Sequence, residues 1–576
     1  AISNDNRLPV DYRVPAFHGL SAENEAMKWD FFVRHYGDDT RQKRDPKYTD
    51  NYQGETVDGV LYPRAGCLGG CTAHNAMITV YPHNADWDYI ATLTQDDSWK
   101  AAHMRGYFQK MENCRHRPVY RLLSKLGINP TQHGFDGWLP TEAAIPKTAL
   151  GDEELVHTIA DSVEAVLKNL GQPLERARWQ KNALGDPNDW RVVQEDSWGL
   201  RYPPLSTHQH ERSGSRERLL AVQKAHPERL HIELHATATR VLFDENLRAI
   251  GVEYLKGERL YKAHSQPRGR STDLRQALCS KEVILAGGAF NTPQLLMLSG
   301  IGPRATLEQF DIEVKVELPG VGQNLQDRYE VGVINRMKFD AWEVLKGATY
   351  APGDPQYAQW EQKRAGVYTT NGAVLAVIKR SRPERALPDL FCFALLAKFP
   401  GYYPGYSALA KQHLNYLTWA VLKAHTNNRA GYVTLRSKNP LDTPLINFRY
   451  FDEGNDSTGE DLDSVVAGIR FVRELTRELR EEGIIAAEEA PGSALQSDAE
   501  LKQFVKDHAW GHHASCTCPI GADNDPMAVL DSRFRVRGTQ GLRVVDASVF
   551  PKIPGFFIVS AVYMIGEKAA DVILNG

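Results

Sequence analysis

The chain has 576 residues, 42% of them apolar and 24% charged, and a formal net charge of −4. This length exceeds what a single hydrophobic core normally holds, so we expect two closely built domains. The small negative charge, without a block of basic residues, argues against nucleic acid as a partner.

Neither a disulfide framework nor a membrane span is expected. The seven cysteines are scattered thinly along the chain. No stretch approaches the ~18 consecutive apolar residues that span a bilayer, so we expect no transmembrane segment. The first residues are polar and carry no charged-then-apolar signal, which favours a cytoplasmic location.

Three stretches are predicted to be helices. Residues 98–113 follow a capping Ser98, and residues 152–170 begin at a capping Asp152. Residues 460–482 repeat apolar side chains at helical intervals.

The segment VILAGG (283–288) predicts a short strand that ends at paired glycines, directly before a helical run. At such a junction backbone N–H groups face a ligand, because the start of a helix is electropositive. Further on, residues 331–435 are rich in aromatic side chains. Each of these rings either packs in a core or lines an apolar cavity, and both interpretations stay open.

Four motifs carry the functional signal. They are PRAGCLGGCTAHNAM (63–77), GGAFNTPQLLMLSGIGP (287–303), LPGVGQNLQD (318–327), and HASCTCPIG (513–521) followed by GLRVVDASVFPKIP (541–554). In order and spacing they resemble the glucose-methanol-choline (GMC) oxidoreductases, which usually bind FAD. The second motif is close to a signature of that family.

The resemblance implies an α/β fold. A GMC-type flavin-binding domain, Rossmann-like but incomplete at its N-terminus, would carry a substrate domain with an antiparallel sheet. The implied division is residues 1–115 for the first flavin-binding segment, 116–205 for a cap segment of the substrate domain, 206–328 for the second flavin-binding segment, 329–510 for the substrate domain, and 511–576 for the C-terminal flavin-binding segment with the catalytic loop.

Several residues are expected to touch the cofactor. Glycine lets the backbone approach a flat ring or a pyrophosphate, and an asparagine amide can both donate and accept a hydrogen bond. The cofactor-binding positions implied by the resemblance are Gly69, Gly70, Cys71, Asn75, Ala76, Met77, Thr239, Gly287, Asp546 and Ala547.

His74 stands where choline-oxidase-like members attach FAD covalently. A neutral imidazole nitrogen is a nucleophile, so such a bond is chemically reasonable. The alternative is a histidine that hydrogen-bonds nearby backbone.

His513 is the expected catalytic base. The pattern H-x-x-x-T-C-x-I-G matches the histidine loop of the family, and a histidine suits removal of an alcohol proton because its ordinary pKa lies near the working pH. His512 is a candidate helper. A zinc site formed by His512, His513, Cys516 and Cys518 is the alternative, and it is disfavoured because HH and C-x-C pairs are closer than structural zinc sites prefer. No metal is expected.

Two features depart from the family. No G-x-G-x-x-G turn stands between a strand and a helix, although that unit binds the ADP half of FAD. The chain is then a fragment, works with a second chain that supplies the unit, or has lost FAD. The second departure is Phe557, next to Phe556, at the position where the family places a polar partner for the catalytic histidine. The two phenylalanines favour a substrate with an apolar end.

We therefore expect a FAD-dependent oxidoreductase that oxidises an alcohol CH–OH group to a carbonyl, with hydride passing to flavin N5. Its small-molecule substrate would be an alcohol with an apolar part, and its electron acceptor O₂ or a redox partner. The alternatives are a lyase or flavin-dependent decarboxylase on the same scaffold, and a flavin-free binding protein.

Overall fold

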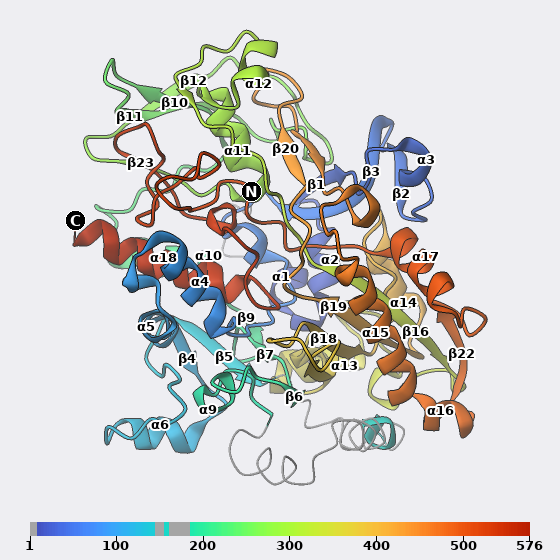
Figure 1. Ribbon diagram of the computed structural model, residues 1–576. Helices are drawn as coiled ribbons and strands as arrows, with labels where there is room; N and C mark the ends of the chain where they lie inside the picture. Colours follow the sequence, from blue (N-terminus) through green and yellow to red (C-terminus); the bar gives the residue numbers. More distant parts are fainter. Residues whose placement is uncertain (1–7, 144–151, 153–154, 160–184, 576) are drawn as a thin grey trace.

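The computed structural model describes residues 8–143, 152, 155–159 and 185–575 (Figure 1). Its largest sheet has six strands, all paired antiparallel. In spatial order these are β22 (Ile485–Ala490), β16 (Tyr329–Met337), β19 (Tyr416–Lys423), β18 (Leu390–Leu395), β17 (Ala373–Lys379) and β6 (Gly199–Arg201).

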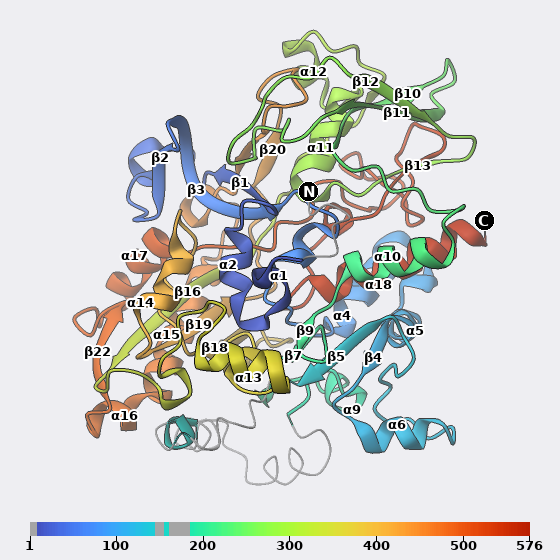
Figure 2. The ribbon, with the colours of Figure 1, turned by 180° about the vertical axis from the view of Figure 1, so that it is seen from behind.

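The central strands of this sheet are covered on both faces. Helix α15 (Glu460–Leu475) packs against β16, β18 and β19, and α17 (Asp498–His508) packs against α15. The view from behind shows α1 (Val10–Arg13), α2 (His18–Ala22) and α13 (Pro355–Lys363) on the side away from α15 (Figure 2). Because neither face meets solvent, every residue of β19 is buried, and its sequence YLTWAVLK is apolar almost throughout.

The other half of the molecule joins segments from distant places in the chain. Strand β13 (Val283–Leu285) pairs in parallel with β23 (Leu542–Val544), and α18 (Val559–Leu574) packs against α5 (Ala101–Met111). Next to α11 (Gly288–Leu298) lies an antiparallel meander of β10 (Ala236–Phe243), β11 (Ala249–Lys256) and β12 (Leu274–Leu278). The predicted strand, glycine turn and helix at 283–298 are confirmed.

Near the N-terminus, β1 (Lys28–Val33), β2 (Tyr48–Tyr52) and β3 (Glu55–Ala65) form a three-stranded antiparallel sheet in the order β1-β3-β2. Strand β3 leads directly into the first glycine motif.

The helices over 98–113 and 460–482 are confirmed with two corrections. Helix α5 begins at Ala101 instead of Ser98, because Ser98 lies in a separate 3-10 turn (Asp97–Trp99), and its backbone N–H donates to the Asp96 side chain. The helix predicted over 460–482 breaks at Thr476 into α15 and α16 (Arg477–Glu481). The helix predicted over 152–170 falls mostly outside the described residues. Among those described, no helix has the length and apolar character to cross a membrane.

Candidate active site

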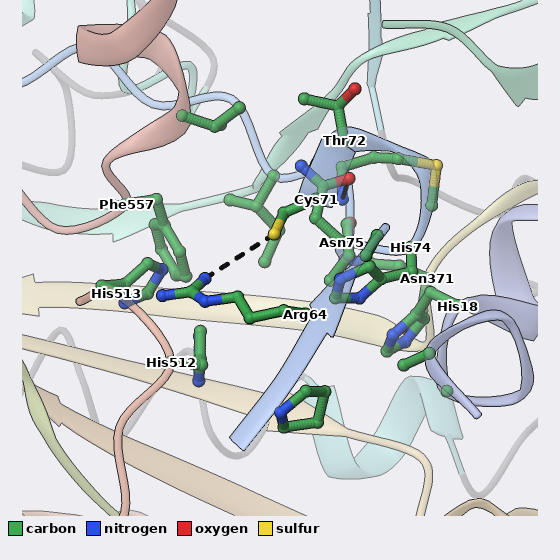
Figure 3. A pocket seen from close by; sticks show the side chains of 18 of the residues that line it. His18, Arg64, Cys71, Thr72, His74, Asn75, Asn371, His512, His513 and Phe557 are labelled. Atoms are coloured by element: carbon green, nitrogen blue, oxygen red, sulfur yellow. Dashed lines mark hydrogen bonds between the residues drawn. The ribbon is translucent and has the colours of Figure 1, made fainter. Parts of the chain in front are cut away.

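A cavity of about 870 Å³ lies where the two halves of the molecule meet. Its wall includes the first glycine motif, the start of α11, the histidine loop and the end of β18. Figure 3 shows His512, His513 and Phe557 on one side of this space and the loop with Cys71, His74 and Asn75 on the other. The first, second and fourth motifs therefore meet at one place.

The histidine loop is held by Asp327, the last residue of the third motif. The backbone N–H of His513 donates to Asp327 Oδ1 (2.8 Å), and the hydroxyl of Tyr62 donates to Asp327 Oδ2 (2.5 Å). The Tyr62 oxygen in turn accepts the backbone N–H of Ala514 (2.8 Å). Burial raises the pKa of Asp327 to about 6, against the effect of these hydrogen bonds. The third motif thus positions the loop without lining the cavity.

Both histidines of the loop favour the neutral form. Burial comes first among the causes that lower the pKa of His513 well below its ordinary value; repulsion from His512 in its protonated form and from the positive charges of Arg328 and Arg64 follows. Burial likewise lowers the pKa of His512 to about 3. A neutral imidazole has a free lone pair, so His513 is in the state that a base needs.

Glu330 lies beside the histidine pair on β16. Its Oε1 atom is 3.9 Å from His513 Nδ1 and 3.5 Å from His512 Nε2. Neither Glu330 Oε1 nor His513 Nδ1 makes a hydrogen bond, although both are buried. Burial raises the pKa of Glu330 well above its ordinary value. The structure thus provides a carboxyl group near His513, where the sequence offered only Phe557 as a neighbour.

The glycine loop presents an open backbone to the cavity. Gly69 and Gly70 adopt positive φ angles of 99° and 56°, and a Cβ atom built on Gly70 would meet nothing within 4 Å. The Asn75 side-chain oxygen accepts the Met77 backbone N–H (3.2 Å) and Arg212 Nη1 (2.8 Å), which fixes the amide. This loop can lie flat against a planar ring.

Cys71 and His74 are the two nucleophiles of this loop. Burial raises the pKa of Cys71, but the guanidinium of Arg64 and a hydrogen bond with His74 outweigh it and lower that pKa to about 6. Arg64 Nη1 lies 3.8 Å from Cys71 Sγ (Figure 3). His74 Nε2 is buried and has no hydrogen-bond partner.

Asp546 ties the second motif to the fourth. Its Oδ2 atom accepts the backbone N–H of Gly288 (2.9 Å) and the hydroxyl of Thr292 (2.6 Å). The next residue, Ala547, accepts the backbone N–H of Cys516 from the histidine loop (3.1 Å). Gly287, Asp546 and Ala547 all line the cavity.

Comparison with known proteins identifies the family. GMC oxidoreductase domains match residues 56–330 and 427–566. The mitochondrial choline dehydrogenase of Mus musculus is 32% identical over 92% of this chain, and the match covers 79% of that protein. The chain belongs to the GMC oxidoreductase family.

Other relatives extend the GMC match. Versicolorin B synthase of Emericella nidulans is 28% identical over 97% of this chain and 84% of its own length. A solved structure of a formate oxidase of Aspergillus oryzae RIB40 superposes with a TM-score of 0.75 at 21% identity, over 98% of this chain and 91% of that one. These matches confirm the α/β fold with a GMC flavin-binding domain and an antiparallel substrate domain. As a GMC oxidoreductase, the protein is a FAD-dependent enzyme that oxidises alcohols.

The residues present fit the flavin end of FAD. Loop 69–77 has an open glycine surface, and the unpartnered His74 Nε2 lies in the same wall. At the start of α11, a Cβ atom on Gly288 would also meet nothing within 4 Å, so the backbone there is open to a ligand. These residues, with Asn75, would hold the ring and its ribityl chain.

Two predicted site residues lie outside the cavity lining of this GMC protein. Thr239 is in β10, where its hydroxyl donates to Glu253 Oε1 (2.8 Å). Phe556 packs against Phe391 and His83, with ring centroids 5.4 and 5.1 Å away. Phe557 does line the cavity, with its ring centroid 5.6 Å from that of His513.

The zinc alternative at the histidine loop is not supported by the geometry. Cys516 and Cys518 are buried, and the candidate ligand group found there among the described residues combines His512 and His513 with Glu330 instead.

Three residues of the site were not predicted from the sequence. Arg64 belongs to the first motif but was not singled out there. Glu330 is an acidic residue within the largely apolar strand YEVGVINRM, and this exception in the sequence could have marked it as a site residue. His18, whose Nε2 lies 3.2 Å from the Asn371 carbonyl, had no motif to mark it.

Proposed function

We propose that the protein oxidises an alcohol CH–OH group to a carbonyl, with His513 as the base that takes the hydroxyl proton. The observation that carries the proposal is a neutral, buried histidine in the wall of the cavity, facing the glycine loop across it. FAD supplies the hydride acceptor at N5. The lowered pKa keeps His513 ready to accept a proton, and the Asp327 hydrogen bond fixes the loop while it does so.

Glu330 is proposed as the polar partner of His513. Because Phe557 can neither donate nor accept a proton, the Glu330 carboxyl group, 3.9 Å from Nδ1, is the group that can stabilise the protonated imidazole. Protonation of His513 lowers the pKa of Glu330, since an opposite charge at this distance favours the carboxylate, and a Glu330 proton would then leave to solvent.

The substrate is proposed to carry an apolar part. Phe393, Phe399 and Phe557 line the cavity together with Tyr402 and Tyr406. Choline, the substrate named in several relatives, is the first alcohol to test, because aromatic rings attract such cations. A cation beside Glu330, which also lines the cavity, would in addition favour the ionised form of that carboxyl group. The electron acceptor is proposed to be O₂ or a redox partner, and rates with O₂ and with an artificial dye distinguish the two.

The ADP half of FAD is proposed to be bound by residues beyond those described, with a second chain as one source. This follows from the G-x-G-x-x-G pattern, which is missing between a strand and a helix in the printed sequence. Native mass measurement of the flavin-containing protein distinguishes one chain from two.

The test of the proposed base is His513→Asn. We expect kcat/KM for the best alcohol to fall by about 10²–10⁴-fold while the bound flavin and the melting temperature stay unchanged. His508→Asn is the matched control, because His508 stacks on Phe504 (4.4 Å) and does not line the cavity. Activity of the His513 variant within about threefold of the parent would contradict the proposal.

The pH profile of the parent enzyme gives a second readout of the same base. A base works in its deprotonated form, so activity is lost as pH falls through its pKa, and here that pKa is lowered. We expect kcat/KM to stay level from pH ~8 to below pH ~6.5, the ordinary histidine value, and to fall only at more acidic pH. An acid limb centred above pH ~7 would exclude His513 as the base.

The second candidate is a non-redox reaction, that of a lyase or flavin-dependent decarboxylase, on the same scaffold. Versicolorin B synthase, a relative whose name does not describe an oxidation, supports this candidate. The non-redox reaction predicts turnover without reduction of the flavin. Anaerobic mixing with substrate decides between the two, because only alcohol oxidation bleaches the flavin absorbance.

A further inference from the structure

A cysteine, two histidines and an aspartate form a buried cluster away from the flavin cavity. Cys114 ends β4 (Glu112–Cys114), His116 precedes α6 (Pro118–Ser124), and His133 lies in the loop before β5 (Leu139–Ala143). Asp186 comes from the segment before α9 (Trp190–Val193), and these elements lie together in the lower part of Figure 1. The side chains of His133 and Asp186 are 0% exposed and that of His116 is 6% exposed. None of the four lines the cavity.

Two distances within the cluster are close to the edges of a tetrahedral zinc site. With Zn–S near ~2.3 Å and Zn–N or Zn–O near ~2.0–2.1 Å, neighbouring ligands stand about 3.6 Å (S to N) and about 3.3 Å (N to O) apart. Cys114 Sγ is 3.7 Å from His116 Nε2, and His133 Nε2 is 3.2 Å from Asp186 Oδ2. His116 Nε2 is 2.8 Å from the same Asp186 oxygen, a separation that would lengthen with an ion between them. The ligand atoms of Cys114, His116 and His133 all lie within 4.8 Å of one another.

One histidine of this cluster turns a ring nitrogen toward Asp186. His133 Nδ1 donates to Glu112 Oε2 (2.9 Å), which places the ring proton on Nδ1. His133 Nε2 then faces Asp186 Oδ2 at 3.2 Å, in a direction that does not meet the geometry of a hydrogen bond. A carboxylate behind a metal-binding histidine is the usual outer partner in zinc sites, because it fixes the tautomer and raises the basicity of the ligand.

His116 also has an acceptor at each ring nitrogen. Its Nδ1 lies 3.4 Å from the Thr141 carbonyl, and its Nε2 lies 2.8 Å from Asp186 Oδ2. Binding through Nε2 would keep the Thr141 contact at Nδ1 and would need the Cys114 thiol, now 3.7 Å from both ring nitrogens, to shift toward Nε2.

We propose that Cys114, His116, His133 and Asp186 bind one Zn²⁺ ion. The thiolate and the carboxylate together carry two negative charges, which balance the ion, and binding releases the thiol proton to solvent. Four protein ligands leave no open position, so the site is structural. It ties β4 and the loop before β5 to the segment that precedes α9. This revises the expectation of no metal, at a place away from the histidine loop where zinc was disfavoured.

The competing arrangement is an ion-pair network without metal. There, both histidines are protonated: burial opposes this, but Cys114 and Asp186 raise the pKa of His116 to about 10. Arg117 Nε also donates to Asp186 (3.2 Å) and would share its charge. In that network a hydroxyl group could replace the Cys114 thiol, whereas the proposed zinc site requires the Cys114 sulfur.

The experiment is metal analysis of the purified, full-length protein together with X-ray absorption at the zinc edge. We expect one equivalent of zinc per chain, with one sulfur at about 2.3 Å and three nitrogen or oxygen neighbours at about 2.0–2.1 Å. A chain that holds less than a tenth of an equivalent, and takes up none after incubation with zinc salt, would overturn the proposal. Bound zinc without a sulfur neighbour would overturn it equally.

Variants add an independent readout that does not depend on flavin or activity. Cys114→Ser should lower the zinc content at least tenfold, and Glu112→Gln should weaken zinc affinity by about 10–100-fold. Cys279→Ser is the matched control, because this partly exposed thiol lies outside the cluster and should leave zinc unchanged. Full zinc content in Cys114→Ser would refute the site. If that variant does not fold, the absorption spectrum of the parent protein still decides.

Discussion

At the scale of single residues, burial determines the chemistry of the site. The same removal from water lowers the pKa of His513 and raises those of Asp327 and Glu330, because burial disfavours whichever form is charged. The consequence is a neutral base beside a carboxyl group that can ionise when the base becomes charged. Phe557 contributes only shape, and Glu330, the polar partner that we propose, stands on β16 and not in the C-terminal segment that holds Phe557.

His74 is expected to carry the flavin through a covalent bond. Its Nε2 is buried without a hydrogen bond in the wall of the cavity, as a nucleophile ready for such a bond would be. We expect acid-precipitated protein to keep its yellow colour in the pellet, and His74→Ala to release it into the supernatant.

Cys71→Ser is the control for this assignment. The thiol of Cys71, with its pKa lowered to about 6, is the other nucleophile of the loop. Colour retained in the Cys71→Ser pellet supports His74. Colour lost from Cys71→Ser but kept in His74→Ala would move the bond to the cysteine, and colour wholly in the parent's supernatant would exclude both.

At the scale of elements, α15 lies close against the six-stranded sheet. Gly468 faces the sheet from α15, and a Cβ atom there would lie 2.4 Å from Val421 Cγ1 in β19. The helix was predictable from its apolar spacing, but this close approach was not, because it depends on which strand the helix crosses.

We therefore expect Gly468→Ala to destabilise the protein. Overpacking costs about 1–3 kcal/mol, which exceeds the about 0.5–1 kcal/mol that alanine contributes in a helix. Gly106→Ala is the matched control, since Gly106 lies on α5 with nothing within 4 Å, and it should stabilise by about 0.5–1 kcal/mol. The thermal unfolding midpoints of the two variants measure both effects. Equal shifts of the same sign would contradict the close approach of Gly468 to β19.

At the scale of the whole molecule, segments from both ends of the chain pack together. Strand β23 completes the parallel pair with β13, and α18 completes the packing of α5. The five-segment division of the chain remains a proposal, in which residues 511–576 belong to the same unit as residues 1–115 and 206–328.

That division has a direct test by truncation. A chain that ends at residue 510 loses β23, α18 and the histidine loop, which exposes the core around Leu285 and Met104. We expect it to be insoluble or rapidly proteolysed, whereas a chain that ends at Ile573 should fold, because Leu574 is 82% exposed. A soluble, protease-resistant 1–510 chain with native circular dichroism would show that the C-terminal segment is a separate unit.

The sequence by itself determined the family, the order of the motifs, the strand and helix around the paired glycines, and the candidate residues for the base and the flavin neighbours. These are local or ordered patterns, and each residue type carries its chemistry wherever it stands. Only the tertiary structure decided that Asp327 holds the histidine loop, that Glu330 stands beside His513, that Thr239 and Phe556 lie outside the cavity lining, and that Asp186 joins Cys114 and two histidines. Each of these depends on contacts between segments far apart in the chain, and such contacts follow from the packing of whole elements and not from any stretch of sequence.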